Sequence, residues 1–254
     1  MIHRVQRLLA AYRPPRSKEC VLCGSRVAGF LPYRRGSASK PMFMRAMEVV
    51  GSDVDNFGCP RCSGHDRERH LLLYMRAANL FDRIAGGDVL HFAPERRLSE
   101  FIRAAAPRRY IRCDLHPGSD DVVRVDLLAV PYPDTSFDLV IANHVLEHVA
   151  DDRKALSEIR RVLKIGGHAI LQTPYSSRLH HTWEDPGIDD DSARLQAHGQ
   201  EDHVRLYGLD IFERIAACGL QSRVRQHDEL LADVDARRLG VNPREPFMLF
   251  QRRD

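Results

Sequence analysis

The sequence has no apolar run approaching the ~20 residues that a membrane-spanning helix needs, and it has no low-complexity tract. Its first residues, MIHRVQRLLAAYRPP, have too short an apolar part and too many arginines for a secretory signal, and they predict a basic amphipathic helix ending at Pro14. With 43% hydrophobic and 29% charged residues, the composition is that of a soluble globular protein. These absences argue against a membrane protein, and the cytoplasm is the expected location.

Charge is unevenly distributed along the chain. Residues 1–76 hold 14 Lys and Arg against 6 Asp and Glu, whereas the remainder holds 24 against 29. A basic N-terminal region on an acidic body suggests an anionic partner such as a nucleic acid, a phosphorylated small molecule or a nucleotide-sugar. Arg67, Arg69 and His70 could contribute to such an anion site. The alternative is that these basic residues only solvate the surface, including one face of a helix.

Cysteine is scarce, but four of the six cysteines form two C-x2-C pairs, Cys20 with Cys23 and Cys59 with Cys62, each followed closely by glycine. This spacing is typical of a four-thiolate zinc site, because both sulfurs of a pair can reach one ion. A thioredoxin-like redox pair and two structural disulfides are the alternatives. The expected cytosolic location argues against disulfides, and no βαβ pattern surrounds either pair. A closed shell of four sulfurs leaves no open position, so we expect a structural zinc ion.

A helix is expected over residues 66–85, with Asp66 as its cap, and a shorter one over residues 40–50. The longer helix would join the zinc module to the rest of the chain. We therefore divide the chain into an N-terminal basic zinc-binding module with its linker helix, residues 1–82, and an α/β body, residues 83–254.

The clearest pattern lies between Pro131 and Pro174. An apolar run at 137–142 predicts a strand, apolar residues at three- and four-residue steps predict a helix over 151–164, and 168–172 predicts a second strand after a Gly-Gly stop. Two parallel strands joined by a crossover helix form one unit of an α/β sheet. Ligands of such sheets bind at the carboxyl ends of the strands, so the residues that follow the first strand are candidates for function.

Three segments here resemble the second half of the class I S-adenosylmethionine (SAM) dependent methyltransferase fold. They are P-x-P-D-x-S-F-D at 131–138, V-L-E-H at 145–148 and R-V-L-K-x-G-G at 161–167. The resemblance implies a Rossmann-like α/β fold with a seven-stranded, mostly parallel sheet. Residues 220–226 and 246–252 would form its antiparallel closing hairpin, and the cysteine pairs would form a small zinc-ribbon-like domain ahead of it.

The chain departs from the family at the cofactor loop. After the expected strand 88–92 the family has a glycine-rich loop, whereas this chain has Ala93-Pro94-Glu95-Arg96-Arg97. Glycines there allow positive φ and close approach of the backbone to the cofactor. The Ala-Pro pair predicts that a helix starts at once and aims its N-terminal amides at the pocket. The segment H-F-A-P-E is similar to a variant loop of bacterial methyltransferase-like proteins with paired cysteines.

Acidic residues follow the next two expected strands. The resemblance implies that Asp114, at the end of strand 109–114, accepts both ribose hydroxyls of SAM, with a turn-capping role as the alternative. It also implies that Asp126 and Leu127, after a strand at 121–125, contact adenine. Glu95 could pair with the ammonium group of SAM or serve only the helix dipole. The cofactor contacts implied together are His91, Ala93, Glu95, Asp114, Leu115, Asp126, Leu127 and Asn143.

Residues 175–204 are polar, rich in His and Asp, and contain the only tryptophan, Trp183. A loop this long in a globular domain is often a functional lid, and a lone tryptophan suggests a stacking contact or a lid anchor. The histidines and acids of this segment could hold a base or a second metal ion, but no ligand spacing supports the metal.

Methyl transfer from a sulfonium needs alignment of the acceptor, exclusion of water and removal of one proton. Histidine suits the last task near neutral pH. His144, just past the central strand, is the first candidate for the base, and His203 in the lid is the second. Glu147 and His148 are expected to brace the loop.

The favoured function is therefore a SAM-dependent methyltransferase acting on an oxygen or nitrogen of a small molecule or saccharide, because of the lid. An RNA methyltransferase with a zinc finger for substrate binding is one alternative. A SAM-fold protein that has lost methyl transfer and serves as a binding subunit is the other, since the loop glycines are missing.

Overall fold

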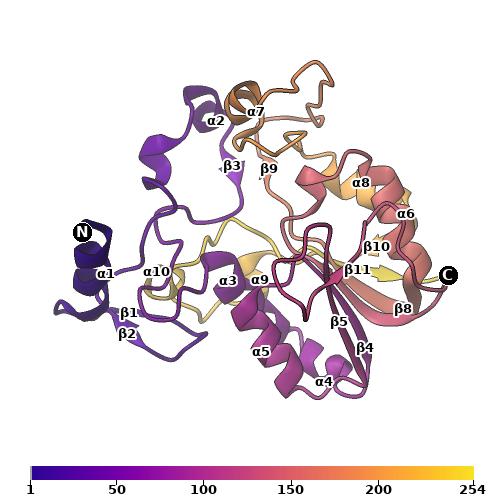
Figure 1. The fold of residues 1–254 in the computed structure, drawn as a ribbon, viewed down its shortest axis with the longest axis horizontal. Helices are drawn as coiled ribbons and strands as arrows, with labels where there is room; N and C mark the ends of the chain where they lie inside the picture. Colours follow the sequence, from indigo (N-terminus) through magenta and orange to yellow (C-terminus); the bar gives the residue numbers. More distant parts are fainter. Residues whose placement is uncertain (1) are drawn as a thin grey trace.

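The central sheet has the strand order β10-β11-β8-β7-β4-β5-β6 in the computed structural model, which describes residues 2–254 (Figure 1). Strands β6, β5, β4, β7 and β8 are parallel to one another, whereas β11 is antiparallel to both of its neighbours. This order confirms the expected Rossmann-like sheet of seven mostly parallel strands. The strands are β4 (Asp88–Phe92), β5 (Arg109–Asp114), β6 (Val123–Arg124), β7 (Phe137–Ala142), β8 (Leu163–Ile170), β10 (Leu220–Ser222) and β11 (Leu249–Arg252).

Three strands, β4, β5 and β7, begin and end where the sequence pattern places them. The segment after β7 differs from expectation. Helix α6 (Asp152–Val162) ends two residues early, and β8 starts immediately at Leu163. Gly166, with φ of +80°, therefore lies inside the strand and does not terminate the helix.

The expected linker helix is two helices, α3 (Asp66–Ala77) and α4 (Leu80–Ile84). Asn79 separates them with φ of +53°, a left-handed conformation that asparagine adopts more readily than most residues. His65 is the N-cap of α3, whereas Asp66, expected to cap it, is the first helical residue. The apolar side of α3 and α4 packs on the sheet, as the pattern predicts.

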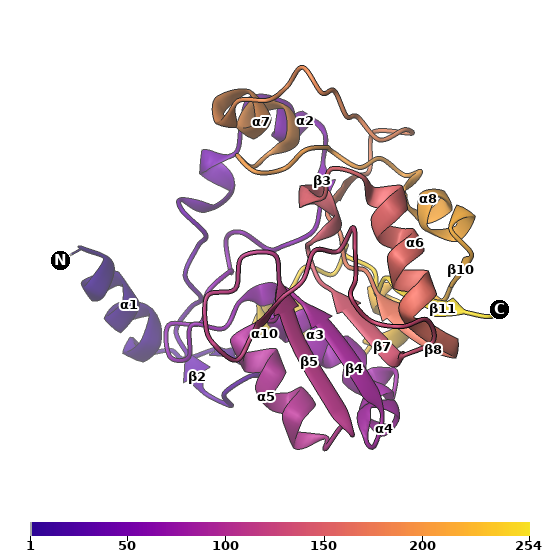
Figure 2. The same cartoon turned by 45° about the vertical axis from the view of Figure 1, so that its right-hand side comes forward.

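Helices cover both faces of the sheet (Figures 1 and 2). Alternate strand residues point to opposite faces, so that Val89 packs with α3, α4 and α5 (Arg96–Ala104), whereas Leu90 packs with α6 and α8 (Ile211–Ala217). The core on the α3 side continues without a break into the cysteine module, where it includes Phe30. The module therefore shares its apolar core with the sheet.

The N-terminal part contains α1 (Ile2–Tyr12) and a two-stranded hairpin, β1 (Lys18–Glu19) and β2 (Arg26–Val27). Arg69 of α3 ties this part to the body. Its guanidinium is fully buried and donates to carbonyl oxygens on both sides, including Phe57 at 3.1 Å and Gly240 at 2.7 Å. A solvated helix face is therefore wrong for Arg69, and His70 beside it is also buried.

The lid is attached to the N-terminal part and is not a free loop. The expected helix over 40–50 is instead the short α2 (Met42–Ala46) followed by β3 (Val49–Val50). Strand β3 pairs antiparallel with β9 (Tyr175–Ser176), the first residues of the lid. Helices α2 and α7 (Asp191–His198) lie side by side at the top of Figures 1 and 2, and Phe43 contacts Trp183 edge to face with ring centroids 5.2 Å apart.

Short helices complete the chain: η1 (Gly36–Ser39), η2 (Leu146–His148), α9 (His227–Leu230) and α10 (Ala236–Leu239). None of the helices between residues 2 and 254 is long and apolar enough to cross a membrane.

Candidate functional site

The glycine-free loop after β4 still makes a left-handed turn. Ala93 has φ of +46°, the conformation for which glycine is usually needed. Pro94 and Glu95 remain outside the helix, Glu95 is the extended N-cap residue, and α5 starts at Arg96. The expectation that a helix begins directly after Ala93 is therefore wrong, and the exposed Ala93 supplies the turn.

The N-terminal amides of α5 do not point freely into a pocket. The carboxylate of Glu68, from α3, accepts the backbone N–H groups of Arg97 at 3.0 Å and Leu98 at 3.2 Å. A second oxygen of the same carboxylate accepts the N–H of His65 at 2.9 Å. Glu68 thus caps two helices at once, and the helix dipole of α5 is satisfied by the protein itself.

Glu95 lies at the carboxyl ends of β4 and β7, where two side chains hold it. His91 Nε2 is 3.0 Å from one carboxylate oxygen, and the amide nitrogen of Asn143 donates to the other. His91 is in turn 2.8 Å from the hydroxyl of Tyr110. Burial opposes the ionisation of Glu95, but the hydrogen bond and the charge of His91, together with the charge of Arg67, outweigh it and keep the pKa of this carboxyl below its usual value. Glu95 is therefore an anion at neutral pH.

Asn143 brings a second acceptor to the same place. It is buried, and its Oδ1 has no hydrogen-bond partner within residues 2–254. An unpaired buried oxygen next to a carboxylate is costly unless a ligand donates to it. His91, by contrast, is fully buried behind Glu95 and acts as its brace.

The other expected cofactor residues lie at the ends of β5 and β6. Asp114 is half-buried, and its Oδ1 accepts the backbone N–H of His116 at 2.8 Å. Leu115 next to it is exposed. Asp126 is exposed and accepts the N–H of Leu128 at 2.8 Å, whereas the side chain of Leu127 is buried in the core. The parallel register of β4, β5, β6 and β7 places these residues along the same edge of the sheet.

A cavity of about 400 Å³ lies beyond the end of β7, between the lid and the segment 33–57 of the N-terminal part. We call it the lid cavity. Its wall includes residues from four segments that are distant in sequence: Lys40 of the segment 33–57, Arg67 of α3, His203 of the lid, and the loop after β7. That loop contributes His144, Glu147 and His148, so the two residues expected to brace the loop also line the cavity.

His144 stands between two buried carboxylates. Its Nδ1 is 3.4 Å from Glu147 and its Nε2 is 3.5 Å from Glu245. Burial disfavours the charged imidazolium, but the two carboxylates outweigh it and raise the pKa of His144 to about 9. Among the described residues its backbone is also unusual, with φ of +54°. His144 is thus held as a cation at neutral pH.

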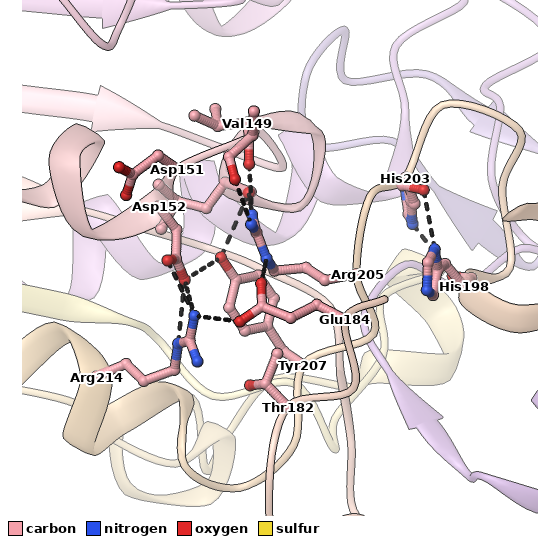
Figure 3. Close-up of polar contacts among 12 residues, drawn as sticks. Val149, Asp151, Asp152, Thr182, Glu184, His198, His203, Arg205, Tyr207 and Arg214 are labelled. Carbon is pink, nitrogen blue, oxygen red and sulfur yellow. Dashed lines mark hydrogen bonds and ion pairs between the residues drawn. The ribbon is translucent and has the colours of Figure 1, made fainter. Parts of the chain in front are cut away.

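His203 has the opposite character. Its Nδ1 is 3.3 Å from the carbonyl oxygen of His198, and Nδ1 of His198 is 3.0 Å from the carbonyl oxygen of His203 (Figure 3). Each imidazole therefore carries its proton on Nδ1 and presents Nε2. Burial lowers the pKa of His203, which makes it a neutral imidazole.

A network of charged side chains fixes the lid to the loop after β7 (Figure 3). Arg205 is buried and donates to the carbonyl oxygens of Leu146 and Ala150, at 3.1 and 2.9 Å, and to Glu184 at 2.7 Å. Tyr207 donates its hydroxyl to Asp152 at 2.9 Å. Of the lid's polar residues, His180 and His181 are exposed, whereas Glu184 is engaged in this network. The network holds His203 against the residues of η2.

The four paired cysteines converge as the spacing predicts. The four Sγ atoms all lie within 4.8 Å of one another. The Sγ atoms of Cys20 and Cys62 are 3.8 Å apart, and those of Cys23 and Cys59 are 3.9 Å apart. In a tetrahedral zinc site with Zn–S bonds of ~2.3 Å, the sulfurs are ~3.8 Å apart. The donor set and its geometry therefore fit a zinc ion, and the remaining cysteines, Cys113 and Cys218, lie elsewhere.

Two residues of the site have no signal in the sequence. Glu245 lies in the connection before β11, yet it faces His144 and, at 3.2 Å, His70. Glu68 lies in a helix whose pattern indicates only packing. Both residues contact partners that are distant in sequence, and the local hydrophobic periodicity does not reveal such contacts.

Comparisons with known proteins agree with the fold. A family model described as a methyltransferase domain matches residues 97–171. An uncharacterized methyltransferase of Bacillus subtilis is 35% identical over 81 residues, covering 32% of this chain and 30% of that protein. A probable S-adenosylmethionine-dependent methyltransferase of Mycolicibacterium smegmatis is 33% identical over 116 residues, covering 42% of this chain and 44% of that protein.

Another relative matches over a longer stretch of the chain. A probable S-adenosylmethionine-dependent methyltransferase of Mycobacterium tuberculosis is 28% identical over 183 residues, covering 68% of this chain and 62% of that protein. A solved S-adenosylmethionine-dependent methyltransferase from Mesorhizobium loti is 15% identical, with a TM-score of 0.49, over 71% of this chain and 100% of that one. The chain spans less than two thirds of the length of the three relatives from Bacillus subtilis, Mycolicibacterium smegmatis and Mycobacterium tuberculosis. The family match and the relatives together support a SAM-dependent methyltransferase.

Proposed function

We propose that this protein is a SAM-dependent methyltransferase that methylates an oxygen or nitrogen of a small molecule held in the lid cavity. The observation that carries the proposal is the position of this cavity. The cavity reaches the carboxyl end of β7, where His144 lines it. The residue before His144 is Asn143, whose side chain contacts Glu95. A cofactor held at Glu95 and an acceptor in the lid cavity would therefore meet at the end of the central strand.

The residues at the sheet edge fit SAM. The Glu95 carboxylate and the unpaired Oδ1 of Asn143 are acceptors suited to its ammonium group. Asp114 would accept the ribose hydroxyls, and Asp126 with Leu127 would hold adenine, as the family resemblance implies. When bound, SAM supplies an electrophilic methyl group. The chain's part is then to align the acceptor, exclude water and manage one proton.

The cavity wall supports a polar or anionic acceptor. Lys40 and Arg67 line it, and Nε of Arg67 is buried with no hydrogen-bond partner in the part of the chain that the structure describes. A buried, unpaired guanidinium nitrogen suits an oxygen of the ligand. A saccharide or an acidic small molecule meets this requirement, and the segment 33–57 and the lid would exclude water around it.

Of the two histidines considered for the base, His203 has the better geometry. Its Nδ1 is oriented by the carbonyl oxygen of His198, which leaves Nε2 on the side of the cavity. Both ring nitrogens of His144 face carboxylates instead. We therefore assign proton acceptance to His203 and assign to His144 the role of a fixed positive charge at the end of β7.

The cysteine module would hold a structural zinc ion through Cys20, Cys23, Cys59 and Cys62. Since its core is continuous with that of the sheet, the ion would stabilise the N-terminal part that forms one wall of the lid cavity. The closed set of four sulfurs leaves this ion no position for substrate.

Isothermal titration calorimetry with SAM and with its demethylated product tests the proposal. Micromolar binding of both is expected. Heat from neither ligand at millimolar concentration would favour the alternative in which the fold has lost methyl transfer. Retention on RNA at low salt that disappears at higher salt would favour the RNA methyltransferase, which the comparisons do not favour.

A further inference from the structure

We propose that Glu147, His148 and His203 form a binding site for a divalent transition-metal ion in the lid cavity, separate from the four-cysteine site. One nitrogen of each imidazole and one oxygen of the carboxylate lie within 4.8 Å of one another. All three residues line the lid cavity. Two histidines and one carboxylate are a recurrent ligand set for zinc and iron, and they leave further positions of the metal open.

The two histidines are oriented as metal-binding histidines are. Nδ1 of His148 is 3.2 Å from a carboxylate oxygen of Asp202, and Nδ1 of His203 is 3.3 Å from the carbonyl oxygen of His198. In metal sites the nitrogen that does not bind the ion donates to a carboxylate or a backbone carbonyl, which fixes the ring and its tautomer. Here both partners are already present, and Nε2 of each ring is the nitrogen left to bind an ion.

Glu147 provides an independent indication. Glu147 is only 1% exposed, and its Oε2 has no hydrogen-bond partner among the described residues. The other oxygen is 3.4 Å from Nδ1 of His144. A buried carboxylate oxygen without a donor is costly, and a cation held by the neighbouring imidazoles would satisfy it.

The three ligands come from two segments that are fixed to each other. The backbone N–H of Val204, next to His203, donates to the carbonyl oxygen of Glu147 at 3.0 Å. Arg205 adds hydrogen bonds to Leu146 and Ala150 on either side of Glu147 and His148. The ligand spacing is therefore built into the attachment of the lid and does not depend on a mobile loop.

This site also limits the class of molecules that could accept the methyl group, an inference that rests on the proposed function. A metal ion open toward the cavity would bind an acceptor hydroxyl and lower its pKa, so the acceptor would be a hydroxylated molecule that coordinates through oxygen. With the ion bound, Nε2 of His203 would hold the metal and would no longer accept a proton, so the hydroxyl would lose its proton to water as it binds the ion, before methyl transfer.

Manganese binding tests the site without activity, because Mn²⁺ prefers oxygen and nitrogen ligands and would not displace zinc from four thiolates. The protein, loaded with one zinc per chain, is titrated with Mn²⁺ followed by electron paramagnetic resonance, and with Co²⁺ followed by absorption. We expect one further ion per chain. His148→Gln and His203→Gln should each weaken its binding at least ~10-fold, and Asp202→Asn, at an exposed partner of His148, by ~10-fold. His181→Gln, an exposed lid histidine, is the matched control and should leave binding unchanged.

Failure of both Mn²⁺ and Co²⁺ to bind below millimolar concentration would overturn the proposal. Binding that His148→Gln, His203→Gln and Asp202→Asn all leave unchanged would overturn it too. Asp202→Asn, at an exposed residue, keeps the test valid if a variant of the half-buried His148 or His203 fails to fold. A SAM titration of the same samples separates this outcome from the proposed function, since SAM can bind whether or not the metal site exists.

Discussion

The carboxylate of Glu68 lies 3.2 Å from the backbone nitrogen of Leu98, so that a residue of the helix after the second cysteine pair caps the first helix of the α/β body. The same carboxylate also caps its own helix through His65. The position of the loop that carries Ala93 and Glu95 is therefore fixed from the cysteine module, and no glycine-rich loop takes part.

Glu68→Ala should lower the free energy of unfolding by about 2 kcal/mol, because capping groups of two helices are lost together. It should also weaken SAM binding, since Glu95 follows the released end of α5. Urea denaturation and calorimetry measure the two effects. Glu100→Ala, which removes only an exposed pair with Arg97, is the control and should change stability by less than ~0.5 kcal/mol. Equal effects of the two variants would contradict the capping role.

Cys59→Ser should lower the zinc content from about one ion per chain to near zero and lower the melting temperature. The physical reason is that three thiolates and one hydroxyl hold zinc far less tightly than four thiolates do. Elemental analysis and thermal melting measure the result. Cys218→Ser, which lies at the end of α8 and outside the cluster, should leave both unchanged. Zinc that remains after Cys59→Ser would refute the four-thiolate site.

Asp114→Ala should weaken SAM binding by about 1–3 kcal/mol, the usual effect of losing a charge-assisted hydrogen bond. Asp120→Ala alters an exposed acid in the loop that follows β5 and serves as the control. Calorimetry compares the two with the unaltered protein. An unchanged affinity of Asp114→Ala would remove this residue from the cofactor site and leave it the role of a turn residue.

Asp66→Asn should change the dependence of stability on pH. Asp66 is buried, and burial together with nearby Glu245 raises its pKa from 3.8 to about 7. The pKa of Asp66 is higher in the folded protein than in the unfolded chain, so the protonated carboxyl stabilises the folded state. This stabilisation is complete below pH ~4 and is lost as the pH rises through ~7, which lowers the free energy of unfolding by up to about 4 kcal/mol. Asparagine can keep the hydrogen bond that Asp53 donates to this side chain and carries no charge.

Urea denaturation near pH ~5 and pH ~8 measures this difference. The variant should gain stability relative to the unaltered protein as the pH rises. Parallel pH profiles of the two proteins would show that Asp66 does not retain its proton in the folded state.

The central strands of the sheet could be predicted from sequence because they are short buried runs. Asp88–Phe92 and Phe137–Ala142 are such runs, whereas Arg109–Asp114 is only partly buried and Val123–Arg124 is exposed. The helix ends were less predictable. The pair Gly166–Gly167 signals a stop, but the strand already begins at Leu163, since pairing with β7 outweighs the local preference.

The site could be predicted only in part, for a related reason. Residues at strand ends, such as Glu95 and Asn143, are found from the sheet pattern alone. The neighbours that set their chemistry come from distant segments. Glu245 reaches His144 from the connection before β11, and nothing in the local sequence indicates that it faces a histidine. The local sequence therefore does not predict the positive charge on His144 and indicates a base there instead.

The pairing of β3 with β9 joins a wall of the lid cavity, to which Val49 belongs, to the first residues of the lid. Only two residues on each strand form this ladder, at Val49 with Ser176 and Val50 with Tyr175. We expect acceptor uptake and product release to require its separation, a step that breaks few hydrogen bonds but moves a whole wall of the cavity. Turnover would then be governed by this opening as well as by chemistry, and changes in β9, whose two residues do not line the cavity, would alter the rate without contacting the acceptor.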